Sequence, residues 1–231
     1  MITVSKMSNQ VETELSRVYT SRFDATQDYR RRVWTVLVSE FFQELVPDSA
    51  VVLDLGCGYG EFINTVKARK KFGMDLNPRT KEHLAPEVAF LRQDCSASWA
   101  VGPEQLDVVF TSNFFEHLAD KGALALTLEQ AFRALRPGGR LIAMGPNIKF
   151  TEGRYWDFWD HYLPLTELSL AEGLAVRGFS IIKNHPRFLP YTMVGAREYP
   201  LWCLSWYLRC PWLWRWKGEQ FLIVAEKPQA G

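Results

Sequence analysis

The sequence predicts an α/β fold in which helices cover both faces of a mostly parallel sheet. Short apolar runs that suit buried strands, such as residues 51–55 and 106–113, alternate with stretches of helical periodicity. The first run is followed at once by a turn that contains three glycines. A chain of 231 residues is long enough to bury the core of one such domain.

The glycine turn is the most informative stretch. Asp54 precedes Gly56, Gly58 and Gly60. Glycine lacks Cβ and adopts positive φ angles, so a ligand can lie against the bare backbone. A helix expected to begin near Gly60 would point free N–H groups into the same gap. The pattern departs from the dinucleotide signature because Glu61 occupies the place of the third glycine, and it lacks the Lys-Ser/Thr pair of a P-loop.

The string Asp54-Leu55-Gly56-Cys57-Gly58-Tyr59-Gly60 resembles motif I of the class I S-adenosylmethionine (SAM) dependent methyltransferases. The resemblance implies that Asp54, the glycines and Cys57 lie beside the methionine part of SAM, with S-adenosylhomocysteine as product. It also implies a Rossmann-like, doubly wound sheet of seven strands in the order 3-2-1-4-5-7-6, with strand 7 antiparallel. On this motif alone, a glycine turn that merely closes an ordinary βα unit stays open.

Two acidic residues follow the next strands. Asp75 closes the strand predicted at 72–76, and a carboxylate there can accept hydrogen bonds from both ribose hydroxyls. Its alternative role is a helix N-cap. In the family that the chain resembles, the next residue, here Leu76, packs on the adenine. Asp94, after the strand predicted at 88–92, would lie near the adenine amino group, with Cys95 contributing a backbone N–H.

The fourth strand, predicted at 106–113, leads into Asn113, Phe114, Glu116 and His117. This string resembles the corresponding stretch of many small-molecule methyltransferases, and we place Asn113 and Phe114 among the cofactor-binding residues. It lacks the prolines of the amino-methylating nucleic-acid enzymes and the Pro-Cys pair of the DNA cytosine enzymes. The chain has 27 basic and 26 acidic residues, which also argues against a nucleic-acid partner.

The later predicted elements continue the alternation of helices and strands. A helix at 124–135 is followed by Leu-Arg-Pro-Gly-Gly-Arg, which ends a helix and turns the chain into the strand predicted at 141–144. This string is a frequent companion of motif I. A helix at 166–177 and strands at 179–184 and 220–226 would follow.

Methyl transfer to a hydroxyl requires a group that takes its proton, and histidine suits that role. His117 lies at the carboxyl edge of the sheet, where open α/β sheets bind ligands. His161 lies after strand five in a segment rich in rings and acids. We expect one of the two to be the base, with Asp157 or Asp160 orienting His161. The alternatives are a packed lid for His161 and a contact near the methionine part of SAM for His117. The sequence has no metal-binding motif.

The chain is expected to form one domain: an N-terminal helical cap at 1–47, a core at 48–184, a tryptophan-rich insertion at 185–218, and the last strand and tail at 219–231. Helices are predicted at 11–29 and 29–45. Tyr19, Phe23 and Tyr29 would cap the cofactor from above. The basic run 30–32 would be the solvated face of a helix, or else an anchor for an anionic substrate.

Five of the nine tryptophans lie between residues 199 and 216. Three interpretations stay open: a hydrophobic cap on the sheet, a homodimer contact, or a peripheral membrane contact. The stretch is too short and too charged for a clean membrane crossing. The four cysteines form no CxxC pair, and the N-terminal stretch is too polar for a signal peptide, so we expect a reducing, cytoplasmic location, with membrane-peripheral association open.

Together these features predict a methyltransferase that acts on a small molecule, at an oxygen of a sugar, a glycoconjugate or a polyketide-like natural product. One alternative is a methyltransferase of an aromatic, quinone-type acceptor. The other is a catalytically silent methyltransferase fold that serves as a binding or scaffold subunit. The intact glycine turn together with Asp54 and Asp75 disfavours the silent protein.

Overall fold

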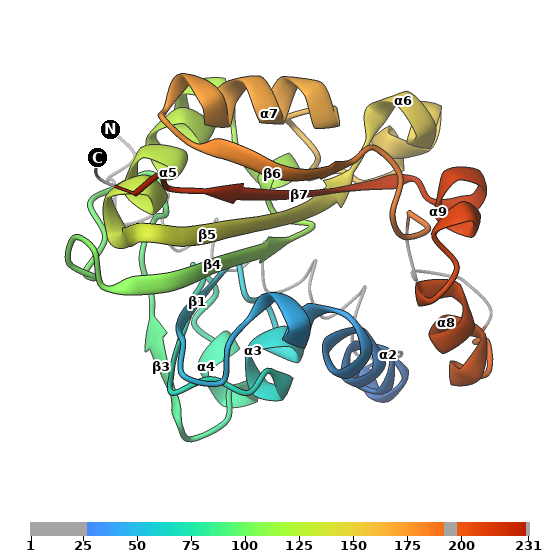
Figure 1. The fold of residues 1–231 in the computed structure, drawn as a ribbon, viewed down its shortest axis with the longest axis horizontal. Coiled ribbons are helices and arrows are strands. Elements are labelled where there is room, and N and C mark those ends of the chain that lie inside the picture. Colours follow the sequence, from blue (N-terminus) through green and yellow to red (C-terminus); the bar gives the residue numbers. More distant parts are fainter. Residues whose placement is uncertain (1–26, 192–197, 230–231) are drawn as a thin grey trace, which may run out of the picture.

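A computed structural model describes residues 27–191 and 198–229 of the chain. Most of the predicted helix at 11–29, with Tyr19 and Phe23, lies outside the described residues. Within them, a seven-stranded sheet has the order β3-β2-β1-β4-β5-β7-β6 (Figure 1). Strands β1 to β5 are parallel to one another, and β7 is antiparallel to both β5 and β6. The predicted fold class and strand order are therefore confirmed.

The strands follow the apolar runs of the sequence. The second strand begins and ends two residues earlier than predicted, because each of its five residues pairs with one residue of the first strand. Asp75 therefore lies just beyond the strand end. The bounds are β1 Val51–Leu55, β2 Lys70–Met74, β3 Val88–Leu91, β4 Leu106–Ser112, β5 Leu135–Pro146, β6 Ser180–His185 and β7 Gln220–Glu226.

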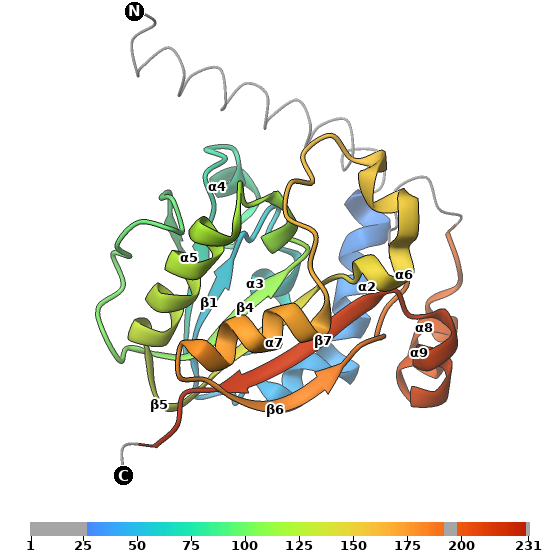
Figure 2. The ribbon, with the colours of Figure 1, turned by 90° about the horizontal axis from the view of Figure 1, so that it is seen from above.

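Helices cover both faces of the sheet (Figure 2). On one face, α5 and α7 pack against alternate strand residues such as Leu53 and Ile223. On the other, α2, α3 and the helices of the insertion pack against the intervening residues, such as Val52 and Leu222. The helices in the described residues are α2 Gln27–Glu40, α3 Glu61–Thr65, α4 Thr80–His83, α5 Lys121–Ala134, α6 Ile148–Thr151, α7 Glu167–Val176, α8 Leu201–Leu208 and α9 Pro211–Lys217.

Helix α2 ends earlier than the predicted helix at 29–45. Phe41 leaves the helical conformation with φ −142°, and a 3₁₀ turn follows at Phe42–Leu45. This break turns two successive rings into the core: Phe41 contacts Phe188, and Phe42 contacts Phe110, at centroid distances of 4.8 and 5.1 Å. Aromatic packing therefore overrides the helical periodicity at this point.

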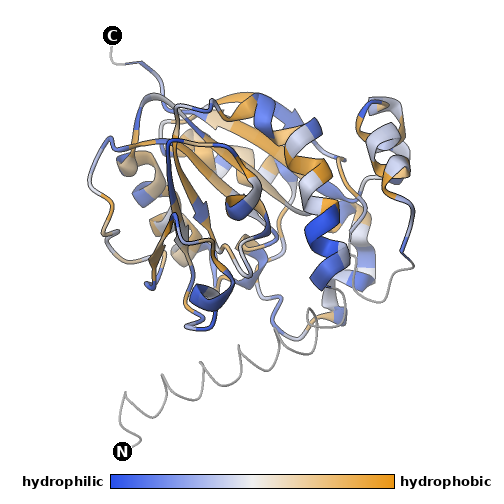
Figure 3. Ribbon diagram, turned by 90° about the horizontal axis from the view of Figure 1, so that it is seen from below, coloured by the Kyte–Doolittle hydropathy of each residue, from blue (hydrophilic) through white to orange (hydrophobic). Residues whose placement is uncertain are grey.

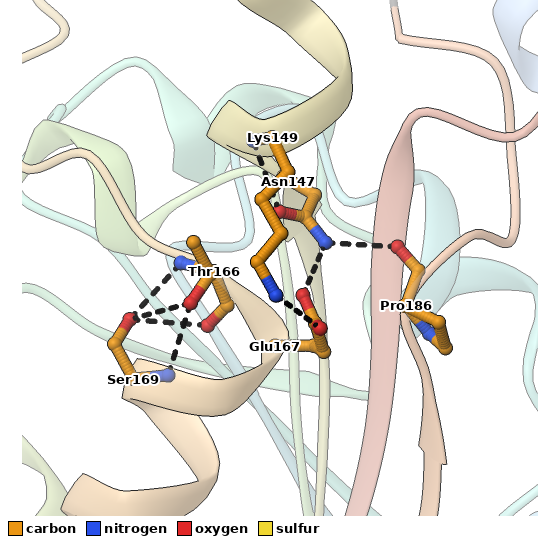
Figure 4. A network of polar contacts seen from close by, with 6 residues as sticks. All are labelled: Asn147, Lys149, Thr166, Glu167, Ser169 and Pro186. Atoms are coloured by element: carbon orange, nitrogen blue, oxygen red, sulfur yellow. Dashed lines mark hydrogen bonds and ion pairs between the residues drawn. The ribbon is translucent and has the colours of Figure 1, made fainter.

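A buried polar network joins the end of β5 to α7 and to the segment after β6 (Figure 4). The Asn147 side chain donates hydrogen bonds to Glu167 Oε2 at 2.6 Å and to the Pro186 carbonyl at 2.9 Å. Lys149 Nζ lies 2.7 Å from the other Glu167 oxygen. The network pairs every strong polar group it buries, so it fixes where the insertion leaves the sheet.

The insertion forms α8 and α9 beside α2, at the end of the molecule (Figures 1 and 2). Ser205 Oγ donates a hydrogen bond to Glu40 on α2 at 2.7 Å. Trp214 is buried against Phe41 and Phe188, as a packed cap predicts. The other tryptophans of α8 and α9 are exposed. Among the helices in the described part of the chain, none has the length and apolar character needed to cross a membrane.

Candidate active site

The glycine turn between β1 and α3 has the backbone that its sequence predicts. Gly56, Gly58 and Gly60 have φ angles of 69°, 53° and 77°. A Cβ atom on Gly56 would lie 2.2 Å from the ring of Phe114. Two successive amides, of Gly56 and Cys57, donate to the Met74 carbonyl and hold the turn to β2. The turn therefore requires glycine for both conformation and space.

Asp75 connects the glycine turn to the end of β2. Its Oδ2 atom accepts a hydrogen bond from the Gly58 amide at 2.9 Å, and its Oδ1 atom accepts one from Asn77 at 2.8 Å. Burial raises the pKa of Asp75, and these amide hydrogen bonds act against the rise. Leu76, the next residue, leaves 48% of its surface exposed. A large apolar side chain in solvent beside a half-buried carboxylate fits the ribose and adenine of SAM.

Asp94 and Cys95, which follow β3, differ in exposure. Asp94 is exposed, and its Oδ1 atom accepts hydrogen bonds from the amide and hydroxyl of Ser96, both at 2.8 Å. Cys95 is buried, and its sulfur accepts a hydrogen bond from Thr127. Burial raises the pKa of Cys95 to about 11 and the pKa of Cys57 as well. Neither thiol is therefore suited to act as a nucleophile.

The end of the site at the glycine turn is acidic. Asp54 is buried, and its carboxylate accepts a hydrogen bond from the Ile63 amide. Burial raises the pKa of Asp54 well above its usual value, and the nearby charges of Glu61 and Asp75 raise it further. Arg30 balances part of this charge through an ion pair of 2.8 Å with Glu61. Such a set favours a bound cation, which suits the ammonium and sulfonium groups of SAM.

A cavity of about 510 Å³ begins at this turn and extends past the ends of β4 and β5 to α2 and α8. The lining of the cavity includes five residues that the sequence predicts to bind the cofactor: Asp54, Gly56, Cys57, Gly58 and Asn113. Its far part is mostly apolar and includes Val33, Trp34, Leu37, Phe158, Leu201 and Leu204. The volume is typical of a site for a small organic molecule.

Polar side chains gather where the two parts of the cavity meet. His117 Nδ1 lies 2.8 Å from the carbonyl oxygen of Asp160 and 3.3 Å from its carboxylate. The His161 ring stacks on Phe158, and its Nδ1 lies 3.4 Å from the Tyr191 hydroxyl. The two histidine rings have centroids 5.0 Å apart. The Nδ1 atom of His117 is therefore engaged by Asp160, which leaves its Nε2 as the nitrogen that can exchange a proton.

The charges of this cluster are coupled. Burial raises the pKa of Glu116 to about 7, although the neighbouring His117 lowers it. Burial by itself lowers the pKa of His117, but the hydrogen bond that its ring donates to Asp160 and the charge of Glu116 outweigh it and raise the pKa above its ordinary value. A histidine with this pKa can accept a proton near neutral pH.

Comparison with known proteins decides the family. A family model described as a methyltransferase domain matches residues 26–184. The chain belongs to this family. SAM is its cofactor and S-adenosylhomocysteine the product, so the family that the resemblance indicated is confirmed.

One curated relative of the methyltransferase comes from Mycolicibacterium smegmatis and is named "Probable S-adenosylmethionine-dependent methyltransferase". The two are 33% identical over 137 residues, which is 56% of this chain and 52% of the relative. The chain thus spans about half the length of the curated relative it matches.

Solved structures show the same fold. A SAM-dependent methyltransferase from Archaeoglobus fulgidus has a TM-score of 0.64 at 18% identity, covering 87% of this chain and 97% of that one. A chain from the complex of a methyltransferase with its Trm112 activator, from Haloferax volcanii, has the same TM-score and identity over 89% and 93%.

In the methyltransferase, the acidic residues Asp157 and Asp160 lie in different surroundings. Asp157 is exposed and does not line the cavity, because the segment turns it toward solvent. Asp160 contacts His117, whereas Tyr191 contacts His161. The expected pairing of His161 with an aspartate orienter stays a prediction.

Several residues that line the cavity are not among the predicted site residues. Glu116 is one of them, although its place beside His117 in the sequence is a usable signal. Tyr191 had no sequence signal because it lies in the insertion. Arg30 lines the cavity and pairs with Glu61, so the solvated-face interpretation of the basic run is wrong for this residue. Tyr29 lines the cavity too, beside the cofactor turn.

One combination in the described residues has the composition of a metal site. Glu116, His117 and His161 each offer one ligand atom, and the three atoms lie within 4.8 Å of one another. Two histidines and a carboxylate are a known ligand set for divalent metals. The same three groups also form a proton-transfer cluster, and the sequence-based expectation of no metal stays a prediction.

Proposed function

We propose that this methyltransferase transfers the methyl group of SAM to a hydroxyl oxygen of a small acceptor with an apolar body, and that His117 takes the hydroxyl proton. One observation carries the proposal: a single cavity links the glycine turn to His117 and then continues between apolar side chains. Such a cavity suits a ligand with one polar end and a larger apolar part.

The cofactor would be held by Asp54 and the glycine turn at its methionine end, and by Asp75 and Leu76 at its nucleoside end. When bound, SAM supplies a methyl carbon that is already activated by the sulfonium. The remaining work falls to the protein, which must hold the acceptor oxygen in line and take its proton. Asn113 and Phe114 pack beside the glycine turn and complete this end of the site.

His117 acts as the base. Asp160 holds its Nδ1, so Nε2 can accept the hydroxyl proton, and the carboxylate then stabilises the imidazolium that forms. Because its pKa lies above the ordinary value for histidine, it is a stronger base than an exposed imidazole. His161 and Tyr191 lie beside it as hydrogen-bonding partners for the acceptor.

The apolar lining selects among the acceptors that the sequence leaves open. Val33, Trp34 and Leu37 of α2 face Leu204 and Tyr207 of α8 across the cavity. A free sugar would bury its hydroxyl groups against these side chains without partners, at a substantial energetic cost. A polyketide-like or phenolic hydroxyl, or the apolar portion of a glycoconjugate, buries favourable surface instead. The near-balanced net charge continues to argue against a nucleic-acid acceptor.

Methyl transfer can be tested with methyl-labelled SAM and a panel of hydroxylated polyketides, phenols, glycolipids and nucleotide sugars. We expect label in an acceptor that has an apolar body, and a rate lower by about 100- to 10,000-fold in His117→Ala, with SAM affinity retained. His185→Ala is the matched control, because that histidine packs on Trp214 outside the cavity. An equal rate in His117→Ala and the wild type would rule out the assigned base. Label confined to nucleotide sugars would rule out the assigned acceptor class.

A further inference from the structure

The outer surface of the insertion is exposed and aromatic. Trp202 and Trp206 on α8 are 67% exposed each, and Trp212 and Trp216 on α9 are 65% and 68% exposed. Together they present on the order of 500 Å² of ring surface to solvent. The largest exposed apolar patch of a monomeric protein is often of this size, and such patches are often functional. We call these two helices, with the four tryptophans, the tryptophan face.

The spacing of these residues separates them from the packed side of each helix. Each pair is four residues apart, which places both members on one side of a helix. Trp212 and Trp216 flank the buried Trp214 at two residues on either side, so they point away from the core. The Trp214 indole donates to the Tyr207 carbonyl at 2.8 Å and joins α9 to α8. Burial of Trp214 and its hydrogen bond therefore hold the two helices of this surface together.

The charged residues of the tryptophan face are all basic. Between residues 199 and 218 the sequence has Arg209, Arg215 and Lys217 and no acidic residue. Lys217 Nζ lies 4.4 Å from the centroid of the Trp216 ring, a cation–π contact that places a positive charge beside this exposed ring. Arg209 forms an ion pair with Glu40 of α2, whereas Arg215 and Lys217 are both exposed at the end of α9.

We propose that the tryptophan face docks on the surface of an anionic lipid bilayer. Tryptophan is favoured at the boundary between headgroups and acyl chains because its ring is apolar and its N–H is polar. Basic side chains beside it are attracted to anionic headgroups. A second copy of this chain is a poorer occupant, since a two-fold contact would place the same basic residues against one another.

Helix α8 connects this face to the active site. Leu201, Leu204 and Tyr207 line the cavity, while Trp202 and Trp206 of the same helix lie on its outer side (Figure 3 shows the helix pair on the rim of the molecule). If the tryptophan face docks on a bilayer, helix α8 lies between the acceptor cavity and the lipid surface. The acceptor class would then be one whose apolar body partitions into lipid, a step that rests on the proposed function.

Vesicle flotation tests the docking without any acceptor. The full chain is mixed with vesicles of phosphatidylcholine and phosphatidylglycerol at about 7:3, or of phosphatidylcholine alone, and floated through a density gradient. We expect the wild type to float with the mixed vesicles and less with the neutral ones. For the variant Trp202→Ser/Trp206→Ser/Trp212→Ser/Trp216→Ser, the fraction of protein that floats with the mixed vesicles should be smaller than that of the wild type by roughly tenfold or more. Equal flotation of this variant, or a wild type that stays at the bottom, would overturn the proposal.

Two further variants keep the test decisive. Leu168→Ser/Val176→Ser removes exposed apolar side chains from α7 and should float like the wild type. Arg215→Glu/Lys217→Glu keeps every tryptophan and should lose flotation with anionic vesicles, even if the tryptophan variant does not fold. SAM binding by each variant shows that it is folded and separates this test from that of methyl transfer. A wild-type dimer in light scattering that becomes a monomer in the tryptophan variant, with no flotation of either, would assign the face to self-association.

Discussion

The Nδ1 atom of His117 lies 2.8 Å from the carbonyl oxygen and 3.3 Å from the carboxylate of Asp160, a residue 43 positions later in the chain. The contact joins the end of β4 to the segment after β5, at the carboxyl edge of the sheet. It fixes the ring and raises its pKa, so the basicity of His117 depends on Asp160. The first prediction follows from this dependence.

The rate of methyl transfer should rise with pH through a pKa above the ordinary histidine value. The base must be neutral, and Asp160, together with Glu116, favours its charged form. Asp160→Asn keeps the shape but removes a negative charge, so the rise should move to lower pH while the maximal rate falls. The pH profile of kcat/KM for both proteins checks this. An unchanged midpoint in Asp160→Asn would mean that His117 does not set the profile.

The glycine turn makes a prediction about stability. Gly56→Ala should destabilise the fold, because φ is +69° there and the new Cβ would meet the Phe114 ring. The backbone part should cost about 1–2 kcal/mol. Adding Phe114→Ala removes the clash with the ring but keeps the Cβ of residue 114, which would lie 2.8 Å from the new Cβ, and keeps the backbone cost, so it should recover only part of the loss. Urea unfolding measures both.

The matched control for this pair is Gly153→Ala. A Cβ on Gly153 would meet nothing within 4 Å, and its φ is not positive. It should change the free energy of unfolding by less than about 0.5 kcal/mol. A Gly56→Ala protein as stable as this control would show that the turn tolerates a side chain, and would remove the reason for glycine there.

Leu76 provides a test of the nucleoside end of the site. It is 48% exposed and lies beside Asp75, so cofactor binding should bury it. Leu76→Ala should raise the Kd for SAM by about tenfold and leave the free energy of unfolding nearly unchanged. Leu168→Ala, at an exposed leucine on α7, is the control and should leave the Kd alone. Equal affinities in the two variants would place the adenine elsewhere.

Removal of divalent metals distinguishes the two roles open to Glu116, His117 and His161. If His117 is the base, its Nε2 cannot also ligate a metal, so a chelator should leave the methyl transfer rate unchanged. Dialysis against a chelator followed by the labelled-SAM assay checks this. Loss of activity that Mg²⁺ or Zn²⁺ restores would instead identify the three residues as ligands.

Local features of this chain could be predicted from its sequence. Residues 51–55 form the predicted strand, and the three glycines have positive φ, because composition and a short turn decide both. The family resemblance also gave the correct strand order, including the antiparallel β7. These elements depend on neighbours in the sequence or on a motif that spans few residues.

The site could be predicted only in part, because its contacts join distant segments. No local pattern distinguishes Asp160, which meets His117, from Asp157, which faces solvent three residues earlier. Tyr191 meets His161 only because the Asn147 network fixes the path of the chain at Pro186. The tryptophan count was visible in the sequence, but only the packing shows that Trp214 is buried and four others are exposed.

The most direct test of the account is isothermal titration of the purified chain with SAM and with S-adenosylhomocysteine, alongside Asp75→Ala and His117→Ala. The account predicts micromolar binding of both compounds by the wild type, the same affinity in His117→Ala, and a large loss in Asp75→Ala, whose carboxylate holds the glycine turn. No binding by a folded wild type that is free of carried-over ligand would contradict the account, because the glycine turn and Asp75 would then serve no cofactor.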